Sequence, residues 1–163
     1  MNKKEKILEL LNKNSLVFTN IDKLFLFISS AMETSVEEVK KLFYQLVSNG
    51  DVFEIRKNKF ITIPSHGYVK GDYSGTSKGF GFVKVKGMAD DIFIPANKTL
   101  GALDGEKVIV KIISQTNEGI DGEVVSVYQE LKNIVGLVKI VAGNLFLDPD
   151  NKRILIDFPI VKT

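Results

Sequence analysis

The chain has 163 residues, of which 44% are hydrophobic and 26% charged, so it is a globular protein of one or two domains rather than a disordered chain. Its net charge of +2 does not by itself indicate a polyanionic partner, and only Arg56 and Arg153 among its 22 basic residues are arginine. It has no cysteine and a single histidine, which excludes disulfides, thiol nucleophiles, cysteine-based zinc sites and multi-histidine metal sites.

The N-terminal stretch does not have the pattern of a targeting segment. Glu5 and Glu9 interrupt its apolar residues, so it does not resemble a secretory signal. Apolar runs elsewhere are far shorter than the ~20 residues that cross a bilayer. We therefore expect a soluble, cytoplasmic protein with no membrane partner.

Residues 1–63 predict three helices followed by a β-hairpin. The first helix is expected to end at Asn14 and Ser15, and a second apolar stretch covers residues 21–28. Thr34 and Ser35 offer an N-cap to a third, amphipathic helix that stops near residues 49–50. Residues 51–56 and 59–63 alternate as two strands. This order resembles a winged helix-turn-helix, and we expect a winged-helix-like domain over residues 1–63.

The role of this N-terminal domain stays open at the level of sequence. Its candidate recognition helix offers only Lys40 and Lys41, whereas DNA affinity depends on several phosphate contacts. A domain for protein contacts, an element that opens duplex RNA, and a contact with structured RNA or the ribosome all remain possible interpretations.

Residues 67–128 change to short strands separated by glycine, which predicts a small β-barrel. The candidate strands are residues 68–73, 79–86, 91–95, 107–113 and 122–128. The expected fold class is therefore α+β and multidomain, with an all-β OB-fold barrel after the helical domain.

Two motifs in this region predict an aromatic surface. On a strand, alternate residues share a face, so Phe80 and Phe82 should point the same way. On the next strand Phe93 lies between two isoleucines that can fill the barrel, which sends Phe93 outward. Outward rings can stack on nucleic acid bases, and Lys78 and Lys84 could meet phosphates. The alternative is that the three phenylalanines belong to the core of the β domain.

The residues KGFGFV at 78–83 and DIFIP at 91–95 resemble the two ribonucleoprotein motifs of cold-shock domains. This resemblance places Tyr73 where those domains carry another aromatic, so Tyr73 is expected to assist base stacking. The later runs LGALDGEKVIV at 100–110 and GEVV at 122–125 are similar to the first cold-shock domain of the ribonuclease R group. That group belongs to the ribonuclease II family of processive 3′→5′ exoribonucleases.

The resemblance implies the N-terminal region of such an enzyme. Residues 133–163 would begin a second, truncated cold-shock barrel, with strands at 154–156 and 158–161. The resemblance places the catalytic domain, with aspartates that hold Mg²⁺, beyond this chain, so no catalytic residue, metal site or cofactor is expected within it. Asp90 and Asp91, like residues 117–119, are interpreted as turn residues. Whether the chain itself is an enzyme stays undecided.

The expected function is capture of single-stranded RNA by Tyr73, Lys78, Phe80, Phe82, Lys84 and Phe93, for delivery to that hydrolytic domain. Two alternatives remain open. One is a stand-alone RNA chaperone or regulator of the cold-shock type. The other is a winged-helix transcription factor that binds duplex DNA.

Overall fold

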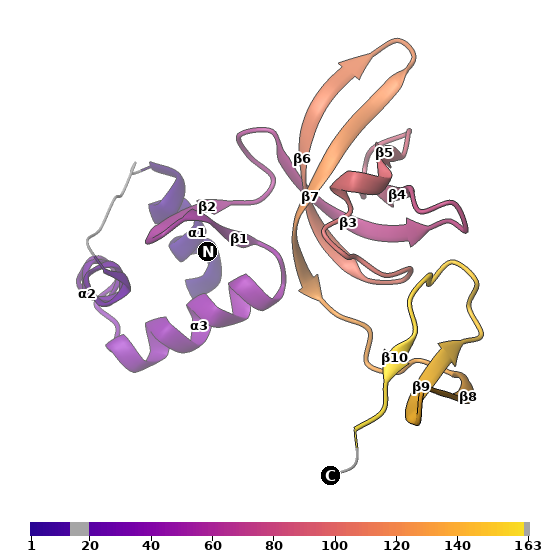
Figure 1. Cartoon of the computed structure of the whole chain (residues 1–163). Helices are drawn as coiled ribbons and strands as arrows, with labels where there is room; N and C mark the ends of the chain where they lie inside the picture. The colour runs from indigo at the N-terminus through magenta and orange to yellow at the C-terminus, as the bar shows by residue number, and fades with distance from the viewer. Residues whose placement is uncertain (14–19, 162–163) are drawn as a thin grey trace. The chain divides into compact units, whose positions relative to one another are not determined.

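The computed structural model describes residues 1–13 and 20–161 and divides the chain into two compact units, Met1–Lys70 and Gly71–Thr163 (Figure 1). Each unit has its own hydrophobic core. Within the described ranges, no helix combines the length and apolar character needed to cross a membrane.

The first unit packs three helices with a two-stranded antiparallel hairpin. The helices are α1 (Lys3–Lys13), α2 (Ile21–Met32) and α3 (Val36–Ser48), and the strands are β1 (Val52–Arg56) and β2 (Lys59–Thr62). Its core contains apolar residues from every helix and from β1: Ile7, Leu11, Leu24, Phe25, Ile28, Val39, Phe43, Leu46 and Val52. The three helices and the hairpin occur where the sequence predicts them. The break expected at Asn14 and Ser15 lies outside the described residues.

Helix α3 shows why these local predictions succeed. The Ser35 side chain accepts a hydrogen bond from the backbone N–H of Glu38 at 3.3 Å, which satisfies one of the unpaired donors of the first turn. Glu37 and Glu38 place negative charge at the positive end of the helix dipole. Beyond the helix, Gly50 adopts a positive φ of 75°, a conformation that glycine accepts without strain.

The second unit contains a closed five-stranded barrel with the strand order β3-β4-β5-β7-β6. The strands are β3 (Tyr68–Gly75), β4 (Gly81–Lys84), β5 (Ile92–Ile94), β6 (Lys107–Thr116) and β7 (Gly119–Gln129). The pairs β3–β4, β4–β5 and β6–β7 are antiparallel, and β5 and β7 pair in parallel. A short 3₁₀ helix, η1 (Ala96–Lys98), follows β5. The barrel confirms the expected α+β class and OB-fold.

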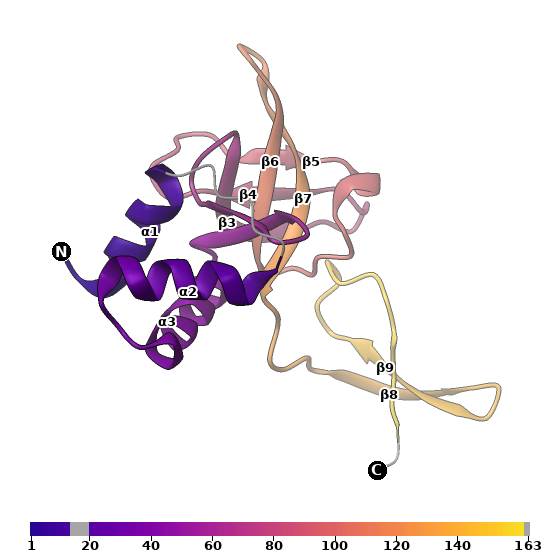
Figure 2. The same ribbon diagram turned by 90° about the vertical axis from the view of Figure 1, so that its left-hand side faces the viewer.

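Backbone hydrogen bonds close the barrel between β3 and the start of β6. The Tyr73 N–H donates to the Glu106 carbonyl at 2.8 Å, and the Gly105 N–H donates to the Tyr73 carbonyl at 2.9 Å. The interior is filled by fully buried aliphatic side chains, which include Val83, Ile92, Ile94, Val108 and Val110. Strands β6 and β7 are longer than the other barrel strands. The tip of the hairpin that they form projects beyond the barrel (Figures 1 and 2).

After the barrel, the chain forms a three-stranded sheet in the order β10-β9-β8. Its strands are β8 (Gly136–Val141), β9 (Asn144–Pro149) and β10 (Phe158–Pro159), and β8 and β9 form a twisted ribbon (Figure 2). Several of its apolar side chains are exposed, Leu137 and Ile140 among them. That this sheet begins a second cold-shock barrel stays a prediction.

The strand expected at residues 154–156 is not formed, so that prediction is wrong. Instead, the residues just before this segment contact the loop that precedes β6. The Asn151 side-chain amide donates to an Asp104 carboxylate oxygen at 2.9 Å, and the Arg153 guanidinium lies 3.9 Å from the other oxygen. Ile154 is buried. Burial of this side chain and the contacts with Asp104 replace strand pairing.

Candidate nucleic-acid interface

Strand alternation on β4 and β5 builds the outer surface that the sequence predicts. On β4, Val83 is fully buried in the barrel, while Phe82 and Lys84 are exposed on the opposite face. On β5, Ile92 and Ile94 are fully buried and Phe93 lies between them on the outer face. Phe82 and Phe93 are direct cross-strand partners in the β4–β5 pairing.

The three phenylalanines form one compact group, which we call the aromatic platform: Phe80, Phe82 and Phe93. Ring centroids are 5.9 Å apart for Phe80 and Phe82, 5.6 Å for Phe80 and Phe93, and 5.7 Å for Phe82 and Phe93. The planes are tilted or edge-to-face, an arrangement that aromatic pairs favour over face-to-face stacking. The rings therefore fix one another's orientation.

The aromatic platform lies on the barrel surface and not in its core. Phe82 is 37% exposed, and Phe80 and Phe93 are partly buried against it and each other. Thr76 orders the loop before β4, because its hydroxyl donates to the Phe80 carbonyl at 2.7 Å. The surface thus offers ring area to solvent on a rigid two-stranded support.

Tyr73 does not belong to this surface, and the expectation that it stacks on bases is corrected. It is 3% exposed, and its ring occupies the space left by Gly81, where a Cβ would lie 2.5 Å from the ring carbons Cε2 and Cζ. Burial, with a smaller contribution from the Asp104 charge, raises the pKa of Tyr73 above its usual value. Tyr73 therefore acts as a neutral packing residue of the barrel.

Two lysines border the aromatic platform, as the sequence predicts. Lys84 shares the outer face of β4 with Phe82, and Lys78 lies in the loop just before Phe80; both are exposed. Asp72 on β3 is the cross-strand partner of Lys84 on β4. The Asp72 carboxylate lies 2.8 Å from the Lys107 ammonium. This hydrogen bond raises the pKa of Lys107. The Asp72 carboxylate therefore pairs with Lys107 of β6.

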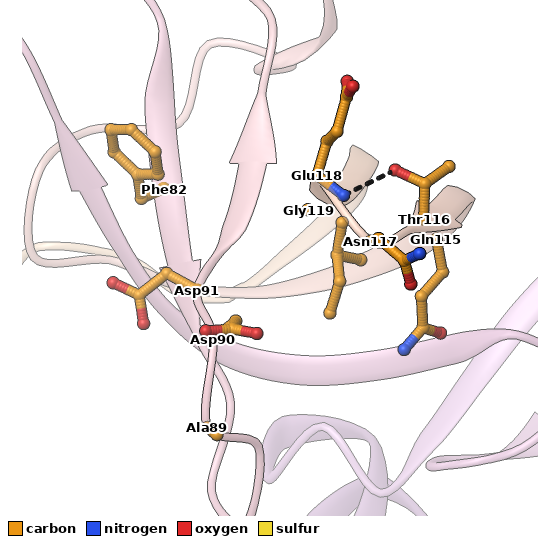
Figure 3. Close-up of a pocket in the computed structure, with 10 residues that line it drawn as sticks. Phe82, Ala89, Asp90, Asp91, Gln115, Thr116, Asn117, Glu118 and Gly119 are labelled. Carbon is orange, nitrogen blue, oxygen red and sulfur yellow. Dashed lines mark hydrogen bonds between the residues drawn. The ribbon is translucent and has the colours of Figure 1, made fainter.

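A pocket beside the aromatic platform was not predicted. It has a volume of about 650 Å³ and lies between the β4–β5 loop and the tip of the β6–β7 hairpin. Phe82, Asp90 and Asp91 lie on one side, and the hairpin tip with Asn117 and Glu118 lies on the other (Figure 3). These residues have turn-like local sequences. Only the parallel pairing of β5 with β7 brings them together, and no local pattern signals that pairing.

The described residues do not fit a metal site. Nowhere in residues 1–13 and 20–161 do three or more histidine or acidic side chains gather in a way that could hold a metal ion. The Mg²⁺ that the family resemblance implies is therefore not assigned to any residue described here.

Comparison with known proteins relates the barrel to a known family of OB domains. Residues 71–127, which cover the barrel from β3 to β7, match the family model described as the ribonuclease B OB domain. Ribonuclease R of Acidithiobacillus ferrooxidans is 23% identical over 132 residues, which cover 80% of this chain and 30% of that protein. Ribonuclease R of Escherichia coli is 24% identical over 130 residues, or 78% of this chain and 16% of that protein.

A solved structure titled as yeast Ssd1, a pseudonuclease, also aligns with the chain. The alignment has a TM-score of 0.46 and a sequence identity of 14%. It covers 58% of this chain and 18% of the Ssd1 chain. The chain spans less than a third of the length of the ribonuclease R relatives named here. The barrel matches the ribonuclease B OB domain, and the chain is similar to ribonuclease R over about four-fifths of its length.

Proposed function

We propose that this protein binds single-stranded RNA on the aromatic platform and presents it to the hydrolytic domain of a ribonuclease R-like 3′→5′ exoribonuclease. Phe82, with Phe80 and Phe93 beside it, stacks against bases, while Lys78 and Lys84 attract the phosphates. In this proposal the Mg²⁺ and the catalytic aspartates belong to the hydrolytic domain. The similarity to ribonuclease R over about four-fifths of the chain supports this context.

The observation that carries the proposal is the exposed ring of Phe82 within a group of three phenylalanines on the outer face of an OB barrel. An exposed ring leaves apolar area in contact with water, and a stacked base removes it. Such stacking contributes about 1–3 kcal/mol per base and is tolerant of sequence. It also favours single strands, because bases in a duplex cannot present their faces to a side chain.

The test is the affinity of the full chain for a labelled oligouridylate, measured by fluorescence anisotropy. Replacement Phe82→Ala should weaken binding by about 1–3 kcal/mol, the contribution of one stacked base. A duplex of the same length should bind more weakly than the single strand in the wild-type protein.

Tyr44→Ala is the matched control, because Tyr44 is another exposed aromatic, 51% exposed on α3. It should leave RNA affinity unchanged. Circular dichroism should confirm that both variants are folded. Unchanged affinity of a folded Phe82→Ala variant, or an equal loss in Tyr44→Ala, would exclude the aromatic platform as the binding surface.

A further inference from the structure

The pocket beside the aromatic platform shares Phe82 with it. The ring forms one wall, the β4–β5 loop a second and the β6–β7 hairpin tip a third (Figure 3). Because Phe82 lines both features, a base stacked on its ring would be next to the pocket. The volume of about 650 Å³ is ample for one nucleobase.

The walls of the pocket carry a specific set of hydrogen-bonding groups. Asp90, Asp91 and Glu118 supply carboxylates, which only accept hydrogen bonds when ionised, while Gln115 and Asn117 supply amides that can also donate. The described lining residues include no lysine or arginine. Such walls repel a phosphate group, so the pocket is suited to the edge of a base rather than to the backbone.

The tip of the hairpin is held in a defined conformation. The backbone N–H of Glu118 donates to the Thr116 hydroxyl at 3.2 Å, as the dashed line in Figure 3 marks. The Ser114 hydroxyl lies 3.3 Å from an Asp121 carboxylate oxygen on the partner strand. These contacts position Asn117 and Glu118 opposite the aspartates of the β4–β5 loop.

We propose that this pocket is a guanine-selective subsite for one nucleotide of the bound single strand. The inference rests on the proposed RNA-binding function. Guanine is the base whose Watson–Crick edge places two donors, N1–H and the N2 amino group, side by side, and a carboxylate can accept both. The neighbouring O6 acceptor suits an amide donor from Gln115 or Asn117. Uracil presents a single donor, N3–H, at this edge, between two carbonyl oxygens that the carboxylates repel.

The experiment compares three labelled RNA strands on the full wild-type chain: oligouridylate, the same strand with one central guanosine, and the same strand with inosine there. One guanosine should tighten binding about 5- to 10-fold, the low end for a bidentate base contact, because the carboxylates are exposed to competing water. Inosine lacks the N2 amino group and should lose most of that gain.

The variant Asp90→Asn/Asp91→Asn/Glu118→Gln should bind the guanosine and uridine strands equally, while binding of oligouridylate is retained. The matched control Glu33→Gln/Glu37→Gln/Glu130→Gln removes three exposed carboxylates that do not line the pocket and should keep the preference. Equal affinity of wild-type protein for all three strands would overturn the subsite and leave the platform intact. A preference that survives in the pocket variant would also overturn it. Absence of binding to any strand would remove the proposed function as well.

Discussion

At the scale of single residues, Gly81 determines where the Tyr73 ring lies. Both residues are on the inner side of the β3–β4 pair, and the missing Cβ of Gly81 gives the ring its space. The alternation of β4 predicts that Phe82 points outward, but it cannot show that a large ring from the next strand fills the gap beneath a glycine. The sequence pattern therefore places Tyr73 on the wrong side of the barrel wall.

Replacement Gly81→Ala should destabilise the protein by about 1–3 kcal/mol, the usual cost of overpacking a filled core. The added methyl group would lie 2.5 Å from the ring carbons Cε2 and Cζ, so the ring or the strand must shift. Urea denaturation followed by circular dichroism measures the loss. Ser77→Ala, in the exposed loop before β4, is the control and should leave the midpoint in place. An unchanged midpoint for Gly81→Ala would contradict the packing described here.

The burial of Tyr73 also predicts how stability depends on pH. Since burial raises the pKa of Tyr73 in the folded state, its neutral form is favoured by folding. The stabilisation is fully present below the ordinary tyrosine pKa of about 10 and is lost as pH rises through the higher folded value. Tyrosinate absorbance should show a late-ionising component that disappears in Tyr73→Phe. An identical absorbance titration for wild-type protein and Tyr73→Phe above the ordinary pKa would show that the Tyr73 ring is accessible to water.

At the scale of elements, the best-predicted parts carry their own start and stop signals. Helix α3 has its N-cap Ser35, its acidic first turn and its terminating glycine within one continuous stretch, and the structure uses all three. The segment 154–156 has the apolar composition of a strand, yet Asp104, far away in sequence, anchors the residues before it. Contacts of this kind are set by the tertiary fold, so the local pattern could not reveal them.

Loss of the cap predicts a measurable change for α3. Ser35→Ala removes the side-chain oxygen that accepts from the Glu38 N–H and should cost about 1 kcal/mol of stability. Thermal unfolding followed by circular dichroism at the helical signal measures it. Ser48→Ala makes the same chemical change at the other, exposed end of α3 and should not lower the melting temperature. Equal effects from the two variants would argue against a capping role for Ser35.

At the scale of the whole molecule, the sequence correctly predicts the α+β class, the OB barrel and part of the candidate site. The motifs at 78–83 and 91–95 fixed the inward and outward faces of β4 and β5, because strand alternation is local. The pocket escaped prediction, because it depends on the parallel pairing of Ile92 with Ile120 and of Phe93 with Asp121. Pairing partners nearly thirty residues apart do not appear in a single sequence.

The charge of the whole chain decides how RNA affinity should depend on salt. With a net charge of +2 and two lysines at the aromatic platform, few counterions are released on binding. For single strands the slope of log K against log salt is about −0.7 per neutralised phosphate, which gives about −1.4 for Lys78 and Lys84 together. Lys84→Ala should halve that slope in anisotropy titrations with oligouridylate.

Lys41→Ala separates this mechanism from binding through the helical unit. Lys41 is an exposed lysine on α3, in the helix that a winged-helix DNA-binding protein would use for recognition. If bases stack on the barrel, Lys41→Ala leaves both the affinity for single-stranded RNA and its salt slope unchanged. Each lost phosphate contact makes the slope about 0.7 less negative. If the wild-type slope is much steeper than −1.4 and becomes shallower in Lys41→Ala but not in Lys84→Ala, the principal nucleic acid contact lies on α3 and not on the aromatic platform.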